Sequence, residues 1–312
     1  MVNYDHPPKS SRHFDGSLYQ TMSDDLQLAG LSKRTVHGYL RAVRQLADWA
    51  QTQPDHVTEL QLRKYFLHLK NERQFAYGSI RVAFSGIKFF YTRTCKRNWE
   101  TLATMKLQQA KTLPEVLTID QVHAIIDACR TERIALFYWT TYSMGLRLDE
   151  TRNLQVGDID GKRMMVHIHR GKGAKDRYIP LPAETLLWLR RHWATHRHPR
   201  FLFPAEGRDH KQSSTSQTPI QTSTVQKAIG KISVKLRFQK KVSTHTLRHS
   251  YATHLLEAGV SLKVIQKYLG HSSLQTTMVY LHLTETAEAN AREEIEKLFG
   301  NLPGRWLPGS RE

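Results

Sequence analysis

Apolar residues recur at helical spacing along most of the chain, and this periodicity is the strongest constraint on its fold. In residues 31–50 one side of a helix would carry an apolar stripe, made up of Val36, Tyr39, Leu40, Val43, Leu46, Ala47 and Ala50. Ser32 precedes this stripe and is a natural N-cap. The same spacing predicts helices over residues 58–69 and 79–94. We therefore expect the first third of the chain to be all helical.

The periodicity stops at residues 106–115, which include a proline and indicate an interdomain linker. We therefore expect two domains, a helical one over residues 17–105 and a second one over residues 116–302. The ends of the chain, residues 1–16 and 303–312, are expected to be flexible. A chain of 312 residues is long enough for two such cores.

The second domain is predicted to combine helices with a small β-sheet. Helical spacing of apolar residues predicts helices over residues 118–129, 133–142 and 182–192. Residues 164–169 and 177–181 are rich in β-formers, and the glycine-rich residues 171–176 join them as a β-hairpin would. A long polar loop, residues 205–221, precedes the last helices. The fold class is thus mainly α with a small β-sheet or hairpin.

The charge of the chain favours a polyanionic partner. Its 46 Lys and Arg against 28 Asp and Glu give a net charge of +18 and a pI near 9.9, and the excess is spread along the chain. Nucleic acid is the usual partner of such a surface, although a merely basic enzyme would look the same. Six polar residues of the first domain and one of the hairpin are expected to contact DNA, or else to form an ordinary solvated surface: Lys33, Arg34, Thr35, Arg41, Arg81, Lys88 and Lys175.

Composition also bears on the cellular compartment. Cys95 and Cys129 are the only cysteines, which is too few for a disulfide framework. The first residues lack the apolar core of a signal peptide, and no apolar run approaches the roughly 20 residues that span a bilayer. We therefore expect a cytoplasmic protein without a membrane partner.

The last third of the chain concentrates groups that suit phosphodiester chemistry. Residues 245–249 read His-Thr-Leu-Arg-His, and His271 and Tyr280 follow shortly after. Arg248 together with Arg147 could clamp the two non-bridging oxygens of one phosphate and stabilise its transition state. His271 could donate to a phosphate oxygen or handle a proton. Tyr280 is the candidate nucleophile, provided that its proton is removed and cations screen the anion.

Two of these residue patterns have other readings. Lys172, at the tip of the expected hairpin, could protonate a departing sugar hydroxyl or be an ordinary turn lysine. His245, His249 and His254 have a spacing that could suggest a metal site. No Glu or Cys accompanies them in a recognised ligand pattern, so we expect neither a metal nor another cofactor.

Taken together, residues 18–295 resemble the tyrosine recombinase, or phage integrase, family. Five motifs carry this resemblance, at residues 144–150, 171–177, 245–256, 269–273 and 276–280. The resemblance implies a helical, SAM-like core-binding domain followed by an α+β catalytic domain, closing as a C-shaped clamp around duplex DNA. It also implies a catalytic set, with Glu150 and His249 in supporting roles: Arg147, Lys172, His245, Arg248, His271 and Tyr280.

The resemblance further implies a reaction course. Tyr280 would attack the scissile phosphate to give a 3′-phosphotyrosyl link and a free 5′-hydroxyl, without ATP or a metal. Two strand exchanges would pass through a Holliday junction held by a homotetramer, with a dimer on each site, acting alone or with a related recombinase. The expected helix at residues 284–299 would dock onto a neighbouring protomer or onto its own domain.

Two alternative functions are also compatible with the sequence. One is a type IB topoisomerase-like enzyme that nicks and closes DNA, although the size and two-domain layout fit a simple Xer-like or mobile-element recombinase better. The other is an inactive DNA-binding accessory protein, which the presence of every catalytic residue argues against.

Overall fold

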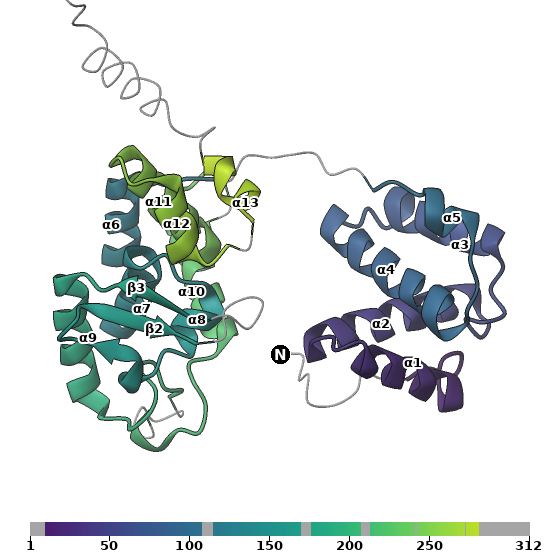
Figure 1. Cartoon of the computed structure of the whole chain (residues 1–312), viewed down its shortest axis with the longest axis horizontal. Coiled ribbons are helices and arrows are strands. Elements are labelled where there is room, and N and C mark those ends of the chain that lie inside the picture. The colour runs from purple at the N-terminus through teal and green to yellow at the C-terminus, as the bar shows by residue number, and fades with distance from the viewer. Residues whose placement is uncertain are drawn as a thin grey trace, which may run out of the picture. The chain divides into compact units, whose positions relative to one another are not determined.

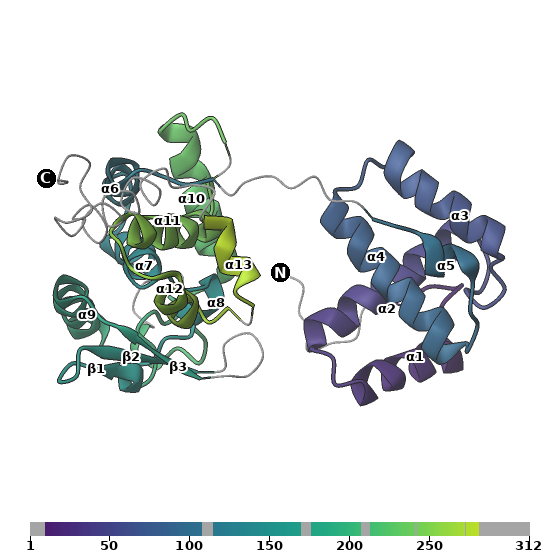
Figure 2. The same cartoon turned by 45° about the horizontal axis from the view of Figure 1, so that its top comes forward.

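The computed structural model of the protein describes residues 10–107, 115–169, 176–206, 213–240, 242–271 and 273–280. The chain divides into two compact units, residues 1–111 and 112–312 (Figure 1). The first unit is helical, and the second combines helices with a small antiparallel sheet (Figures 1 and 2). This confirms the expected fold class.

The first unit contains five α-helices and two π-helical turns in its described part. They are α1 (Gly16–Leu28), α2 (Lys33–Ala50), α3 (Glu59–Leu67), η1 (His68–Glu72), α4 (Tyr77–Phe89), η2 (Phe90–Thr94) and α5 (Glu100–Thr104). Ser32 caps α2 as expected, because its side chain accepts a hydrogen bond from the Thr35 amide. Thr58 and Gln61 form a capping box at the start of α3. Local sequence signals therefore set where these helices begin.

Helices α2 and α4 lie side by side (Figures 1 and 2). The predicted stripe of α2 faces the core, and Leu40, Val43, Leu46 and Ala47 are at most 1% exposed. Gly86 of α4 permits the close approach, since a Cβ atom there would lie 2.8 Å from the Tyr39 Cα atom. Packing of the two backbones thus depends on the absence of one side chain.

Of the N-terminus expected to be flexible over residues 1–16, the described part, residues 10–16, packs on the helical core. Residues 1–9 lie outside the described residues, but Ser11 and Phe14 pair through their backbones. Phe14 is buried, and its ring makes edge contacts with Tyr19 and Phe90. Burial of this aromatic ring holds the segment before α1 on the helical core.

The second unit combines helices with a three-stranded sheet of order β1-β2-β3. Its helices are α6 (Ile119–Asp127), α7 (Glu132–Ser143), α8 (Leu148–Arg152), η3 (Val156–Asp158), α9 (Ala183–His196), η4 (Ser213–Thr215), α10 (Thr222–Lys235), α11 (Thr244–Glu257), α12 (Leu262–Leu269) and α13 (Gln275–Met278). Its strands are β1 (Ile159–Asp160), β2 (Met165–Ile168) and β3 (Arg177–Pro180).

The sheet contains the expected hairpin and one further strand. Strands β2 and β3 pair antiparallel, with Val166 opposite Ile179 and His167 opposite Tyr178. Strand β1 was not expected, and it pairs Ile159 with Val166. Both views show α9 next to the sheet (Figures 1 and 2). The apolar face of β2 and β3 is buried in the core of this unit.

The polar loop expected at residues 205–221 is anchored at its described ends. The Ala205 amide donates to the Thr218 carbonyl at 2.8 Å, and the Ile220 amide donates to the Phe203 carbonyl at 2.8 Å. Ile220 itself is buried in the core. The middle of this loop, the expected helix at residues 284–299 and the tail at residues 303–312 lie outside the described residues.

Among the described residues, no helix has the length and apolar character needed to cross a membrane.

The close approach of α2 and α4 leads to a prediction on stability. Gly86→Ala should lower the free energy of unfolding by about 1–3 kcal/mol, because the new methyl group forces the two backbones apart. Gly78→Ala, in the same helix, meets nothing within 4 Å and should leave stability unchanged or raise it by up to about 1 kcal/mol. Urea unfolding of the full chain, followed by circular dichroism, compares the two variants. Equal stability of both would contradict the packing argument.

Candidate active site

One pocket of the second unit gathers most of the residues expected to carry chemistry. It is lined by Arg147, His245, Arg248, His249, Gly270, His271, Thr276, Val279 and Tyr280. These residues come from the start of α8, from α11, from the end of α12 and from the segment around α13. Segments far apart in the sequence therefore meet at one place.

Local structure sets the direction of several side chains in this pocket. Ser243 caps α11, since its side chain accepts from the Thr246 amide. Within α11, Arg248 and His249 follow His245 by three and four residues, so both lie one helical turn from it and project from the same side of the helix. Arg147 is itself the N-cap of α8. The helix start thus positions one arginine, and the helix face positions the other.

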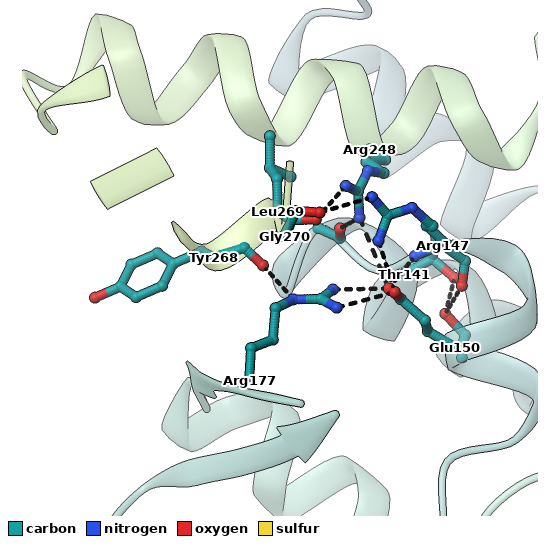
Figure 3. Close-up of polar contacts among 10 residues, drawn as sticks. Thr141, Arg147, Glu150, Arg177, Arg248, Tyr268, Leu269 and Gly270 are labelled. Carbon is teal, nitrogen blue, oxygen red and sulfur yellow. Dashed lines mark hydrogen bonds and ion pairs between the residues drawn. The ribbon is translucent and has the colours of Figure 1, made fainter. Parts of the chain in front are cut away.

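Glu150 lies at the centre of a cluster of arginines (Figure 3). Its carboxylate accepts hydrogen bonds from the Arg147 amide at 2.9 Å and from the Arg147 Nη1 at 2.8 Å. It also accepts two bonds from Arg177, at 3.0 and 2.8 Å, and lies 3.7 Å from the Arg248 Nη1. Burial by itself would raise the pKa of Glu150, but Arg177 and Arg147 outweigh it and lower the pKa to about 2. Glu150 is therefore a carboxylate at neutral pH.

Arg177 was not singled out from the sequence, although it belongs to the hairpin motif. Its side chain is 8% exposed and makes the bidentate pair with Glu150, and its Nε donates to the Tyr268 carbonyl at 2.8 Å (Figure 3). Arg177 stands opposite Ile168, which is buried. Arg177 could have been identified from the sequence, because it is a charged residue on the face of the predicted hairpin that should be buried.

Arg248 is held by two backbone carbonyls and is 2% exposed. Its Nη1 donates to the Gly145 carbonyl at 2.6 Å. Its Nη2 donates to the Leu269 carbonyl at 2.5 Å (Figure 3). Burial, together with the nearby Arg147, lowers the pKa of Arg248 to about 9, so the guanidinium remains charged at neutral pH. A buried cation of this kind needs a fixed set of acceptors.

Gly145, two residues before Arg147, contributes to the packing of the site. It has a φ of +60°, and a Cβ atom there would lie 2.4 Å from the Tyr251 ring. Its carbonyl is the acceptor for Arg248. The glycine therefore permits close packing against α11 and directs a carbonyl to the arginine.

Both arginines keep part of their donor set for a ligand. Arg147 uses one nitrogen for Glu150 and another for the Gly270 carbonyl at 3.2 Å. A guanidinium has more N–H donors than these bonds engage, and the same holds for Arg248. Since both side chains line the pocket, an oxyanion placed there would meet two cations.

Tyr280 is buried, and its hydroxyl forms a 2.8 Å hydrogen bond with the His249 Nδ1. Burial raises the pKa of Tyr280, while the positive charges of Arg248 and Arg147 oppose that shift. For His249, burial followed by the charges of His245 and Arg248 lowers the pKa to about 4. The phenol is therefore protonated and the imidazole beside it is neutral at neutral pH.

His271 and His245 are also neutral in the site as it stands. Burial, followed by Arg248 and Arg147, lowers the pKa of His271 to about 3, and the same three causes lower the pKa of His245. The His271 Nδ1 is hydrogen-bonded to the Thr277 hydroxyl at 2.9 Å, and its ring stacks near Tyr280. This bond fixes the ring orientation beside the tyrosine.

The remaining residues that the sequence singles out are not among those that line the described pocket. Lys172 and Lys175 lie outside the described residues, between β2 and β3. Lys33, Arg34, Arg41, Arg81 and Lys88 are exposed on α2 and α4 of the first unit, and Thr35 contributes to the cap of α2. His254 turns away from the other two histidines of its spacing pattern and bonds to the Tyr142 hydroxyl at 2.8 Å.

Comparison with known proteins gives consistent matches. Residues 115–287 match the phage integrase family, and residues 18–101 match the phage integrase N-terminal SAM-like domain. A protein named integrase/recombinase y4qK from Sinorhizobium fredii is 36% identical over 85% of this chain and 84% of its own length. The tyrosine recombinase XerA of Pyrococcus horikoshii is 30% identical over 91% of this chain and 94% of its own length.

The fold also matches a solved structure. The integrase of the transposon Tn1549, in complex with a circular intermediate DNA, is similar with a TM-score of 0.67 at 18% identity. The match covers 91% of this chain and 100% of that one. At this identity the similarity supports the fold.

The Arg177–Glu150 pair leads to a prediction on stability. Arg177→Ala should lower the free energy of unfolding by about 3 kcal/mol, because it leaves a buried carboxylate with fewer partners. Arg191→Ala is the matched control, since the Arg191–Glu132 pair is 71% and 50% exposed and should contribute less than about 1 kcal/mol. Urea unfolding of both variants measures the difference, and equal losses would contradict the role of burial.

The same pair makes stability depend on pH. Because the pKa of Glu150 lies near 2 in the fold and near 4.5 ordinarily, its contribution is complete above about pH 5. It is lost as pH falls from 4.5 towards 2. Over this window, the free energy of unfolding should change less with pH in Glu150→Gln than in the wild type. Equal slopes of this free energy against pH in the two proteins would argue against the low pKa of Glu150.

Proposed function

The chain belongs to the phage integrase family of tyrosine recombinases, enzymes that break and rejoin DNA with a tyrosine nucleophile, and we propose that its nucleophile is Tyr280. The observation that carries this proposal is the position of the Tyr280 hydroxyl. It lies in one pocket with Arg147 and Arg248, which come from remote parts of the chain. A phosphate held by the two arginines would lie beside the phenol that attacks it.

In the proposed cleavage step, the Tyr280 oxygen attacks the scissile phosphorus. A bond forms between that oxygen and phosphorus, and the bond from phosphorus to the 5′-oxygen breaks. The phenolic proton can leave through the hydrogen bond to the neutral His249 ring. Lys172 protonates the departing 5′-oxygen. The products are a 3′-phosphotyrosyl link and a free 5′-hydroxyl.

The cations of the pocket would stabilise the extra negative charge at phosphorus. Arg147 and Arg248 face the non-bridging oxygens, and His271 and His245 add further N–H donors. Removing one donor of this kind typically costs on the order of a hundredfold or more in rate. Glu150 and Arg177 would act beneath the pocket by holding the two catalytic arginines in place.

In the proposed rejoining step, a 5′-hydroxyl of the partner strand attacks the phosphotyrosine. Lys172 then works in reverse as the base. Energy is retained in the covalent link, so the strand exchange proceeds without ATP. Two such exchanges through a Holliday junction require four active sites, and we propose a homotetramer with a dimer on each duplex site, acting on DNA in the cytoplasm.

The first unit would grip the duplex through exposed basic residues. On α2 and α4 these are Lys33, Arg34, Arg41, Arg81 and Lys88. Thr35, and Lys175 of the hairpin, are proposed as further contacts. Cations on a duplex-facing surface bind phosphates without reading sequence. Membership of the recombinase family does not favour a topoisomerase-like enzyme or an inactive accessory protein.

The nucleophile assignment is tested by trapping the covalent intermediate. On a nicked suicide duplex made from DNA flanking its own gene, the wild type should form an adduct that survives denaturation, because the cut strand cannot be rejoined. Tyr280→Phe should abolish the adduct while binding the duplex as tightly as the wild type. Tyr178→Phe, an exposed tyrosine of β3, is the control and should retain it. An adduct in Tyr280→Phe would overturn the assignment.

The role of Lys172 is tested with a substrate that needs no general acid. Lys172→Ala should slow cleavage by about a hundredfold to ten-thousandfold on the normal substrate. A 5′-bridging sulfur leaves as a thiolate without protonation, so cleavage of that substrate should be nearly unaffected. Lys175→Ala serves as the control. Any slowing of cleavage that it causes should be the same on the normal substrate and on the substrate with the bridging sulfur. Equal slowing of Lys172→Ala on both substrates would exclude the proposed role.

A further inference from the structure

A second group of polar side chains lies at the end of the β2–β3 hairpin where β2 ends and β3 begins. His167 is on β2, His169 follows that strand, and Asp176 precedes β3. His167 and His169 are two residues apart and so face the same side of the sheet, as does Tyr178 opposite His167. Extending the strand register by one pair places Asp176 opposite His169. This cluster takes no part in the reaction proposed above.

The donor atoms of the cluster have the spacing of a metal-ligand set. The His167 Nε2 lies 3.2 Å from the Asp176 Oδ2, and the His169 Nδ1 lies 3.8 Å from the same oxygen. The three donor atoms all lie within 4.8 Å of one another. Around a tetrahedral ion with bonds of about 2.0–2.1 Å, donor atoms are about 3.3 Å apart. Small side-chain rotations would therefore bring all three onto one ion.

A buried carboxylate orients one of the two rings. Asp158 accepts from the Gln155 amide with one oxygen and bonds to the His169 Nε2 at 2.6 Å with the other. Because the Asp158 carboxylate accepts this bond, the ring proton is on Nε2. The Nδ1 atom, on the side of Asp176, then carries the lone pair that can bind an ion. A carboxylate behind a ligating histidine is the usual outer partner at metal sites. The His167 ring is fixed separately, because it stacks on Tyr178 at 4.6 Å.

We propose that His167, His169 and Asp176 bind one divalent transition-metal ion of the zinc class. The ligand atoms are the His167 Nε2, the His169 Nδ1 and a carboxylate oxygen of Asp176, and a water molecule takes a fourth position. His169 and Asp176 are 48% and 50% exposed, so an ion can reach them from solvent. Two imidazoles and one carboxylate suit zinc better than magnesium or calcium, which prefer oxygen ligands.

The ion would join the end of β2 to the start of β3. Arg177 directly follows Asp176 and projects to the opposite face, where it pairs with Glu150. Bound metal would thus stabilise the hairpin that supplies Arg177, and it would bracket the segment that carries Lys172. The site adds no step to the reaction, and binding can be measured without any DNA substrate.

The test is a zinc titration of the full chain, purified without a polyhistidine tag. The wild type should bind one equivalent of zinc chloride, and cobalt chloride in its place should give the visible absorption of a tetrahedral ion. His169→Gln and Asp176→Asn should weaken zinc binding by about a hundredfold or more, and Asp158→Asn by about tenfold to a hundredfold. His56→Gln removes an exposed histidine of the first unit and should bind as the wild type does.

Thermal unfolding gives a second readout that does not rely on any one variant. Saturating zinc should raise the unfolding midpoint of the second unit by several degrees in the wild type and in His56→Gln, because only the folded hairpin assembles the ligands. His169→Gln and His167→Gln should show no such rise. The proposal is overturned if the wild type binds no stoichiometric zinc, or if all variants bind it equally, since the cluster is then a hydrogen-bonded network only.

Discussion

The site depends on the interaction of the buried Glu150 carboxylate with the arginines around it. Arg147 and Arg177 both bond to it, and Arg248 lies within 3.7 Å. Without a central anion, three guanidiniums in a poorly hydrated interior would repel one another. With it, the arginines from α8, β3 and α11 are held together before any ligand arrives. Such prearrangement spares the reaction the cost of assembling its charges.

Burial and the excess of positive charge together explain the protonation states of the pocket. Burial, followed by Arg248 and Arg147, lowers the pKa values of His245 and His271, whereas at Tyr280 burial outweighs the two arginines and raises the pKa. A phosphodiester in the pocket would bring a negative charge close to all of these groups. It would offset the repulsion between cations, so the pocket is electrostatically complementary to the ligand that the proposed reaction requires.

The β2–β3 hairpin connects the active-site pocket with the cluster of His167, His169 and Asp176. One face of the hairpin presents Arg177 of β3 to Glu150, and the other face carries the cluster of His167, His169 and Asp176. Because side chains alternate along a strand, one short element serves both sites. Any ion that fixed the strand ends would also restrict the backbone on which Arg177 depends.

The sequence by itself determined the local features of this protein and the identity of most pocket residues. The N-cap at Ser32, the stripe of α2 and the β2–β3 hairpin follow from rules that act over a few residues. Only the tertiary structure decided which groups meet: Arg177 with Glu150 across 27 positions, His249 with Tyr280 across 31, and Arg248 with the Gly145 carbonyl across 103. Such contacts are set by how whole elements pack, and spacing along the chain carries no record of that packing.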